Sequence, residues 1–435
     1  MVEFFQAYDL RGKYPEQISE KEAEKLGKAY GTYVDSNILV ARDGRTHSPK
    51  ITQAFIQGIN STGTDVTDIG MVPSPVLYFA VDKLGYDNGA VVTASHNPSE
   101  YTGFKYTLDE GLAMSRENGM KEIEEIYEEE SFSTGEGSVE EKDMKEAYID
   151  AVSSKFDANI DVAVNYGNGV TSVVAPEILE KIGCEVKNVN EEVDGEFPNH
   201  LADPTKEEAQ KALKREMNDE DLGILFDGDG DRTGFIYKED YITEDEVLAL
   251  FSEKILENDK GTVVHDLRAS KLVKEKIRGS GGRPAESRVG HTFISEMIHS
   301  DPEVVFAGEL SGHYYFPSLG FPWDDGILAA CLMCEIVNDN DIQKLEAYPD
   351  YPVSPELRID CPEDRKSTVI EKVKEEFSGY EMNDKDGIKI EFENGWALVR
   401  PSNTEEKMSV RCEADTEKDL EDILERVETV VRDNC

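Results

Sequence analysis

Strand-like and helix-like segments alternate along most of this chain, and this alternation narrows the possible folds more than any other feature. In the first hundred residues, short apolar segments typical of strands occur at 37–41, 65–69 and 90–92. Segments with helical periodicity separate them, at 49–59 and 75–84. Alternation at this pace predicts βαβ units and mixed, mostly parallel sheets.

Changes in this pattern divide the chain into several parts. A chain of 435 residues is too long for one ordinary core and suggests two to four domains. The acidic stretch 128–141 is typical of an exposed linker, and close-set strand signals after Pro349 favour an antiparallel α+β domain. The fold class is therefore α/β. We predict three similar α/β domains and a C-terminal α+β domain around a central cleft, at 1–142, 143–241, 242–348 and 349–435.

Acidic residues outnumber basic residues two to one, 92 against 46, which gives a formal net charge of −46. Such a surface repels nucleic-acid phosphates and anionic lipids, so we expect neither nucleic acid nor a membrane as partner. The acids are spread over the whole chain. Our hypothesis is that the protein is halophilic and adapted to a salty cytosol, where about 1 M salt shortens the Debye length to about 3 Å.

Apolar runs and cysteines give no sign of a membrane or a metal. No run approaches the roughly 20 residues that span a bilayer, and the N-terminus lacks the pattern of a signal peptide, so we expect a cytoplasmic protein. The longest run, 327–334, fits a buried helix. Cys331 and Cys334 lie within it, and we interpret them as buried thiols.

The stretch 90–105 ends an apolar strand in a polar turn. Ser95 stands where the strand gives way to the loop, followed by His96 and, ten residues on, by Lys105. Ligands of open α/β sheets bind beyond the carboxyl ends of strands. A serine before Asn-Pro more often caps a turn, so the residue is either a turn cap or a nucleophile.

Three aspartates, Asp227, Asp229 and Asp231, alternate with glycines directly after an apolar strand. Three carboxylates about 4 Å apart repel by about 4 kcal/mol per pair at an effective dielectric near 20, so such a cluster needs a cation. Oxygen ligands favour Mg²⁺ or Ca²⁺. Arg232 and Lys238 stand where an EF-hand needs Gly and Glu, which excludes that motif. The alternative is a solvated acidic turn.

A phosphorylated Ser95 could occupy a position left open on such an ion. Arg11, Lys105 and Arg232 could then balance the charge on a transferring phosphoryl group. We interpret three further arginines as members of surface ion pairs: Arg42, Arg45 and Arg288.

Two more polar loops follow strands. Glu309 and Ser311 are two residues apart, so an extended loop directs both side chains to one side, where they suit vicinal sugar hydroxyls. His313 could relay a proton near neutral pH. The last loop combines one cation with several donors that could grip a phosphate dianion. Its residues are Arg400, Ser402, Asn403 and Thr404. An ordinary polar turn and a hairpin turn are the alternatives.

Four motifs occur in order along the whole chain: Thr-Ala-Ser-His-Asn-Pro at 93–98, Asp-Gly-Asp-Gly-Asp-Arg at 227–232, Gly-Glu-Leu-Ser-Gly-His at 308–313 and Arg-Pro-Ser-Asn-Thr at 400–404. With them the chain resembles the α-D-phosphohexomutase family of phosphomannomutases and phosphoglucomutases. The resemblance implies four domains around a central cleft, the last of them a mobile lid.

The resemblance also implies site roles. Ser95 would be the phosphorylated serine and would hold Mg²⁺ together with Asp227, Asp229 and Asp231. Catalysis would involve Ser95, Arg11, Lys105 and His313. Substrate contacts would come from His96, Arg232, Arg268, His291, Glu309, Ser311, Arg400, Ser402, Asn403 and Thr404. The chain departs from the family pattern at Arg268, where lysine is frequent, and at Glu406, where proline is frequent.

The activity implied is interconversion of hexose 1-phosphate and hexose 6-phosphate through phosphoserine and a hexose 1,6-bisphosphate intermediate. Leu310 and Asn403 favour mannose and glucose phosphates over the phosphoglucosamine mutases of the same family, which remain the alternative. A phosphoserine-dependent phosphatase and a non-enzymatic acidic calcium-binding protein are more distant alternatives. We expect a monomer or a homodimer with small sugar phosphates as partners.

Overall fold

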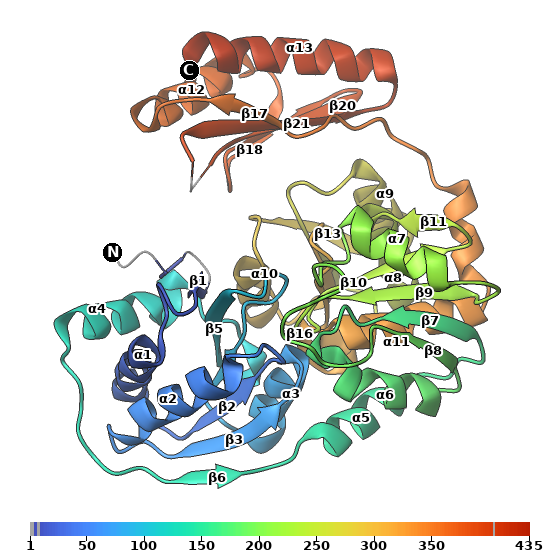
Figure 1. The fold of residues 1–435 in the computed structure, drawn as a ribbon. Coiled ribbons are helices and arrows are strands. Elements are labelled where there is room, and N and C mark those ends of the chain that lie inside the picture. The colour runs from blue at the N-terminus through green and yellow to red at the C-terminus, as the bar shows by residue number, and fades with distance from the viewer. Residues whose placement is uncertain (1–3, 7–8, 403–404) are drawn as a thin grey trace.

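The computed structural model describes residues 4–6, 9–402 and 405–435. The first part of the chain, called domain I here, forms a six-stranded mixed sheet in the order β1-β5-β4-β2-β3-β6 (Figure 1). Its elements are β1 (Leu10–Lys13), α1 (Glu20–Tyr33), β2 (Ile38–Arg42), α2 (Ser48–Asn60), β3 (Val66–Met71), α3 (Ser74–Leu84), β4 (Asn88–Val92), β5 (Tyr101–Leu108), α4 (Lys121–Glu129) and β6 (Val139–Glu141).

Successive side chains of the central strands point to opposite faces of this sheet, and a hydrophobic core lies on each face. Ile38 and Val40 of β2 pack in a core with α1, α2 and α4. Leu39 and Ala41 point the other way, into a core with α3 that continues into the next two domains. The stretch predicted as an exposed linker is exposed, but it also carries β6, which pairs in parallel with β3.

Domains II and III each form a five-stranded mixed sheet, in the orders β11-β10-β9-β7-β8 and β13-β12-β14-β15-β16. Domain II contains α5 (Lys145–Ser153), β7 (Asp161–Asn165), α6 (Ala175–Lys181), β8 (Glu185–Val189), α7 (Glu207–Glu216), β9 (Leu222–Phe226), β10 (Thr233–Tyr237) and β11 (Asp240–Ile242). Domain III contains α8 (Glu244–Asn258), β12 (Thr262–Asp266), α9 (Lys271–Gly279), β13 (Arg283–Ser287), α10 (His291–Ser300), β14 (Val304–Gly308), β15 (Tyr314–Phe316), β16 (Phe321–Asp324) and α11 (Gly326–Asn338).

Helix α11 is the apolar helix expected from the sequence. Asp325 caps its start by accepting hydrogen bonds from the amides of Ile327 and Leu328. Cys331 and Cys334 are both fully buried in it, so their interpretation as buried thiols is confirmed. None of the described helices combines the length and the apolar character that crossing a bilayer requires.

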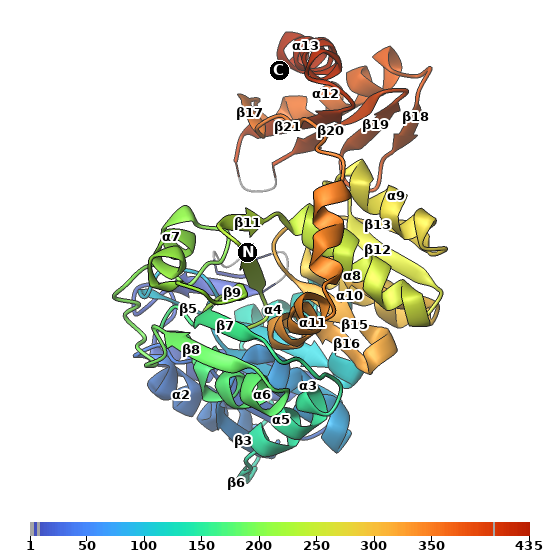
Figure 2. The same ribbon diagram turned by 90° about the vertical axis from the view of Figure 1, so that its right-hand side faces the viewer.

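Domain IV forms an antiparallel sheet in the order β17-β21-β20-β19-β18, and it stands apart at the top of Figures 1 and 2. It contains β17 (Leu357–Asp360), α12 (Glu363–Glu376), β18 (Glu381–Asn383), β19 (Ile388–Phe392), β20 (Gly395–Pro401), β21 (Lys407–Ala414) and α13 (Glu417–Asn434). Its contact with domain III centres on the buried Lys389, which donates to the carbonyl of Leu267 and to Glu286, each at 2.8 Å.

The same connection between two antiparallel strands recurs in all four domains. Each polar loop singled out in the sequence connects a strand to an antiparallel neighbour: β4 to β5, β9 to β10, β14 to β15 and β20 to β21. The loop is thereby held at both ends by a ladder of backbone hydrogen bonds. In domains I, II and III this pairing holds the polar loops between rigid strands, as a functional site requires.

Candidate active site

Ser95 lies in the loop between β4 and β5, in a backbone conformation that few residues adopt. Its φ of 50° is in the left-handed region. The residue is buried, and its amide donates to Thr93 Oγ1 at 2.9 Å. Its hydroxyl donates to Asp227 Oδ2 at 2.7 Å and lies 3.2 Å from His96 Nδ1. The loop therefore directs the serine oxygen at the acidic loop of domain II.

The three aspartates of that loop are almost completely buried, with 0–1% of their surface exposed. The alternative of a solvated acidic turn is therefore wrong. Gly230, at φ 80°, permits the turn and donates its amide to Asp227 at 2.8 Å. Ser74 of domain I donates its hydroxyl to Asp229 Oδ2 at 2.7 Å. Among the described residues, Oδ1 of Asp229 and Oδ1 of Asp231 receive no hydrogen bond.

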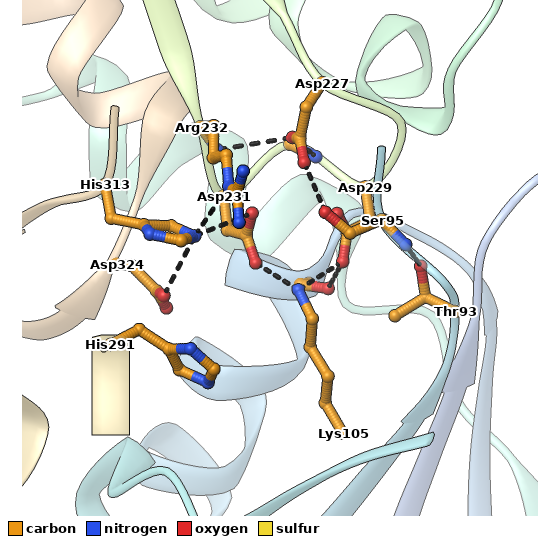
Figure 3. A network of polar contacts seen from close by, with 12 residues as sticks. Thr93, Ser95, Lys105, Asp227, Asp229, Asp231, Arg232, His291, His313 and Asp324 are labelled. Atoms are coloured by element: carbon orange, nitrogen blue, oxygen red, sulfur yellow. Dashed lines mark hydrogen bonds and ion pairs between the residues drawn. The ribbon is translucent and has the colours of Figure 1, made fainter. Parts of the chain in front are cut away.

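Lys105 of β5 is the nearest positive charge to these aspartates. Its ammonium donates to Asp229 Oδ2 at 2.7 Å and also to Asp231 Oδ2 (Figure 3). Burial alone would lower the pKa of Lys105, but the two carboxylates outweigh it and hold that pKa well above the ordinary value. Burial, together with Asp231 and Asp229, raises the pKa of Asp227 well above its ordinary value. One lysine thus compensates the cluster only in part.

His313 connects the domain II loop with domain III. Arg232 Nε donates to His313 Nε2 at 3.1 Å, and Asp231 Oδ1 lies 3.4 Å from the same nitrogen. On the other side of the ring, Nδ1 lies against Glu309 Oε1, and Ser311 Oγ is 3.0 Å away. Burial and Arg232 would lower the pKa of His313, but Asp231 and Glu309 outweigh them and raise it to about 9.

Two other histidines in this region are held neutral. Burial, followed by the charges of Arg232 and Arg11, lowers the pKa of His96 far below its ordinary value. Burial and the nearby His313 lower the pKa of His291 to about 4. The His291 ring lies 5.7 Å from the His313 ring, measured between centroids, and both point into the same region in Figure 3.

Arg11 reaches the same region from β1. Its Nε donates to Asp9 at 2.7 Å, and its Nη1 donates to Asn97 Oδ1 at 2.5 Å. The structure therefore brings together the predicted site residues of domains I, II and III: Arg11, Ser95, His96, Lys105, Asp227, Asp229, Asp231, Arg232, His291, Glu309, Ser311 and His313.

Arg268 lies beside this group. It donates from Nε and Nη2 to Asp266, at 3.3 and 2.7 Å, and Asp266 also accepts the amide of Leu310 at 3.1 Å. The arginine that replaces the frequent lysine is thus connected, through one carboxylate, to the loop that carries Glu309.

The last of the predicted polar loops, which contains Arg400 and is called the distal loop here, lies in domain IV. Arg400 forms an ion pair with Asp386 at 2.8 Å. It lines a pocket of about 180 Å³ together with Ser402 and two cations missed in the sequence, Arg358 and Lys407. The other two predicted residues of this loop, Asn403 and Thr404, lie outside the described residues.

Comparisons with known proteins bear on the whole chain. Four family models match in order: the α/β/α domains I, II and III of phosphoglucomutase/phosphomannomutase, at residues 2–134, 146–240 and 243–351, and the C-terminal domain at 356–430. The chain belongs to the phosphoglucomutase/phosphomannomutase family.

Relatives of this family member span its full length. A phosphomannomutase/phosphoglucomutase of Pseudomonas aeruginosa is 35% identical, over 98% of this chain and 94% of that protein. A probable phosphoglucosamine mutase of Pyrococcus abyssi is 33% identical, over 100% of this chain and 98% of that protein. A crystal structure of a family protein from Burkholderia thailandensis superposes with a TM-score of 0.92 at 30% identity, over 100% of this chain and 98% of that one.

This member of the family is therefore an enzyme, an isomerase that acts as a hexose-phosphate mutase. The alternative of a non-enzymatic calcium-binding protein is wrong. The predicted fold class, three α/β domains with a C-terminal α+β domain, is confirmed.

Sequence reasoning was wrong about two arginines of this mutase and missed several acids. Arg42 donates to the carbonyl oxygen of Asp43 at 3.3 Å and forms no ion pair with the described residues. Arg45 is not in a surface ion pair, because its side chain is fully buried beside Asp43. Arg288 does lie at the surface, 3.8 Å from Glu117. Four carboxylates that orient or face site residues went unnoticed: Asp9, Asp266, Asp324 and Asp386. A weak signal existed for Asp266 and Asp324, since both stand at the ends of apolar strands.

Proposed function

We propose that this enzyme interconverts the 1- and 6-phosphates of mannose and glucose, with Ser95 as the residue that carries the phosphoryl group. The observation that carries this proposal is the contact between loops of two domains, in which Ser95 Oγ lies 2.7 Å from Asp227. Lys105, Arg11 and Arg232 surround that point with positive charge, which suits a transferring phosphoryl group.

Mg²⁺ fits the aspartate loop and is the cofactor we propose. The donors are carboxylate oxygens only, the set that hard divalent cations prefer. Two of these buried oxygens, Oδ1 of Asp229 and Oδ1 of Asp231, receive no hydrogen bond from the described residues. Asp227, Asp229, Asp231 and phosphorylated Ser95 would hold the ion, which supplies electrostatic stabilisation of the phosphoryl oxygens.

The surrounding side chains can manage the proton of the attacking sugar hydroxyl. As the hydroxyl oxygen bonds to phosphorus, the bond from phosphorus to Ser95 Oγ breaks and the hydroxyl proton must leave. The Ser95 oxygen takes up a proton as the hydroxyl loses one, and His313 is our candidate relay between them. Its pKa of about 9 makes it the proton donor near neutral pH, and after donating it accepts the hydroxyl proton in turn. The reverse transfer, from the hexose 1,6-bisphosphate, returns a phosphoryl group to Ser95.

A second anion site supports a mutase mechanism over simple hydrolysis by phosphoserine. Arg400 would bind the phosphate that is not being transferred, and Arg358 and Lys407 line the same pocket. Glu309 and Ser311 would bind sugar hydroxyls between the two anion sites. His96, His291 and Arg268 remain proposed substrate contacts, as do Ser402, Asn403 and Thr404 in the distal loop.

The choice of sugar has one competing answer. The relative from Pyrococcus abyssi named as a probable phosphoglucosamine mutase is nearly as similar to this chain as the phosphomannomutase/phosphoglucomutase. Glucosamine 1-phosphate is therefore the alternative substrate. Leu310, in the loop of domain III, supports mannose and glucose.

A coupled assay distinguishes these substrates. The enzyme is supplied with Mg²⁺, high KCl and a trace of glucose 1,6-bisphosphate, and then with mannose 1-phosphate, glucose 1-phosphate or glucosamine 1-phosphate. We expect 6-phosphate products from mannose and glucose. Turnover of glucosamine 1-phosphate alone would favour the alternative, and release of inorganic phosphate without a 6-phosphate would contradict the proposed reaction.

The charge of the chain supports proposals about its setting. We infer a salty cytoplasm, because a formal net charge of −46 is tolerated best where salt screens self-repulsion. A monomer or homodimer and the four domain boundaries given above also remain proposals. The proposal of a salty cytoplasm is tested by unfolding the protein with denaturant at low and at high KCl. A free energy of unfolding that does not change with salt would contradict it.

A further inference from the structure

A buried arginine, Arg45, supports the Ser95 loop from behind. Its Nη2 donates to the carbonyl oxygens of Ser95 and Asn97, at 2.8 and 2.6 Å. Its Nη1 donates to the carbonyl oxygens of Pro98 and Tyr101, at 2.6 and 3.1 Å. One guanidinium thus satisfies four backbone acceptors within seven residues of chain. Three belong to the loop that carries the proposed phosphoserine, and the fourth, that of Tyr101, belongs to the first residue of β5.

The guanidinium itself is held in one orientation. Its Nε donates to Asp43 Oδ2 at 3.1 Å, and the Arg45 amide donates to Asp43 Oδ1 at 3.1 Å. Ser48 donates its hydroxyl to the same carboxylate at 2.5 Å. Because the donors of arginine form a rigid planar fork, fixing one edge of the group fixes the direction of the other donors.

The same arginine meets the domain that carries the aspartates. Its guanidinium carbon lies 5.0 Å from the centre of the Phe197 ring of domain II. The carbonyl oxygen of Ser95, which Arg45 holds, lies against Gly228 of the aspartate loop, where an added Cβ would come within 2.5 Å of it. Arg45 therefore acts on the point where the serine loop and the aspartate loop touch.

We propose that Arg45 is a positioning residue of this mutase: it fixes Ser95 against the aspartate loop in the geometry that phosphoryl transfer needs. This inference rests on the proposed role of Ser95. The left-handed φ of Ser95, 50°, is a conformation that persists only where the surroundings impose it. Arg45 supplies that constraint through the carbonyl of Ser95 itself.

The proposal predicts a defect in turnover rather than in substrate binding. Arg400 and its pocket lie in domain IV and do not depend on Arg45, so the KM for hexose phosphates should change little. A displacement of the serine by about 1 Å is enough to reduce kcat on the order of 100-fold. We expect that loss for Arg45→Met. We expect a loss on the order of 10-fold for Arg45→Lys, which keeps the charge but not the planar fork.

The experiment compares Arg45→Met, Arg45→Lys and a neighbouring control with the wild type. The control is Thr46→Ala, which removes an exposed hydrogen bond of 2.8 Å to Glu196 between the same two segments. For each protein one measures kcat, KM, the thermal midpoint, and the rate at which glucose 1,6-bisphosphate phosphorylates the enzyme, followed by intact-protein mass. We expect slow phosphorylation in both Arg45 variants and normal values for Thr46→Ala.

The outcomes separate this inference from the proposed function. If the wild type neither turns over hexose phosphates nor becomes phosphorylated, the proposed function fails and this inference fails with it. If the wild type is active and Arg45→Lys folds with unchanged kcat, only the role of Arg45 is overturned. Should Arg45→Met not fold, Arg45→Lys and Asp43→Asn take its place in the test, since both keep the buried site filled. Normal kcat and normal phosphorylation in both would then overturn the role of Arg45. A rise in KM equal to the fall in kcat/KM would also overturn it.

Discussion

The loop around Ser95 and the loop around Arg400 are each held by one buried cation, but they are held differently. Arg45 binds three carbonyl oxygens of the Ser95 loop and that of Tyr101 at the start of β5, and it is itself fixed by Asp43. Lys366 binds two carbonyl oxygens of the distal loop, those of Ser402 and Glu405, at 2.6 and 2.8 Å. A flexible lysine stem constrains a loop less than a planar guanidinium does.

Their surroundings differ in the same sense. The proposed reacting end, around Ser95, is formed by three domains, and its aspartates are nearly inaccessible to water. The distal end belongs to one domain, and the side chain of Arg400 remains 17% exposed. A mutase must transfer a phosphoryl group at one fixed place while the sugar presents first one end and then the other. The comparison indicates that the loop around Ser95 is held in one fixed position, whereas the loop around Arg400 can adjust to the sugar that is bound.

The largest effect is expected for Ser95→Ala, which removes the proposed phosphoryl carrier. Turnover of glucose 1-phosphate should fall on the order of 10⁴-fold or more, because no other hydroxyl can replace the nucleophile. The coupled assay measures this, and intact mass should show no phosphorylation by glucose 1,6-bisphosphate. Ser99→Ala, in the same loop, is the control and should stay within about twofold of wild type. Phosphorylated, active Ser95→Ala would place the carrier elsewhere.

The next effect concerns the metal and has opposite signs for activity and stability. Asp227→Asn should lower activity with Mg²⁺ on the order of 10²-fold or more. In EDTA the same variant should be more stable to urea by about 1 kcal/mol, because one of three adjacent carboxylate charges is gone. Mg²⁺ should stabilise the wild type and not the variant. The exposed Asp219→Asn is the control, and equal stabilisation of both proteins by Mg²⁺ would contradict the proposed site.

The sequence predicted the parts of this site that are local and missed those that depend on long-range contact. A strand signal and the loop after it lie together in the chain, so the four motifs and the strands at 37–41, 65–69 and 90–92 could be located from residue patterns alone. Of the strands after the four loops, β5, β10 and β15 were not predicted, because each follows a polar motif closely, whereas the strand after the last loop was predicted at 408–412.

Arg45 shows why the remainder could not be predicted. Its acceptors are backbone carbonyls 50 to 56 residues away in sequence, and a carbonyl leaves no trace in residue type. An arginine beside an aspartate in an acidic chain is far more often a surface pair. The pairing of Arg400 with Asp386 was missed for a related reason, since it depends on how the turn before β19 folds back toward β20.

Removing the support of the distal loop should affect substrate binding alone. Lys366→Met takes two hydrogen bonds from the loop that carries Ser402, and we expect KM for hexose phosphates to rise about 10-fold with kcat within about threefold. This is the reverse of the pattern expected for Arg45→Met. Lys372→Met, on the exposed face of the same helix, is the control. A loss confined to kcat would show that both loops serve the reacting end.

The smallest effect is expected for Asp386→Asn, and its sign tests whether the distal end is built for release. Asp386 pairs with Arg400 at 2.8 Å and also accepts the amide of Val289 in domain III at 3.2 Å. A substrate phosphate must compete with this carboxylate for the guanidinium. We therefore expect KM to fall about threefold, the scale of a partly exposed ion pair, with kcat nearly unchanged.

Asp384→Asn, an exposed acid in the same turn, is the matched control for this change, since its contact with Lys374 lies at the surface. If KM rises in Asp386→Asn instead, the carboxylate orients Arg400 for binding, and the distal end is as strictly arranged as the reacting end. If KM falls, Asp386 pairs with the guanidinium of Arg400 whenever no substrate phosphate is bound there. Weak binding of the phosphate at the distal loop would then allow the bisphosphate to turn over. The distal loop must release that phosphate before the two ends of the sugar can exchange places.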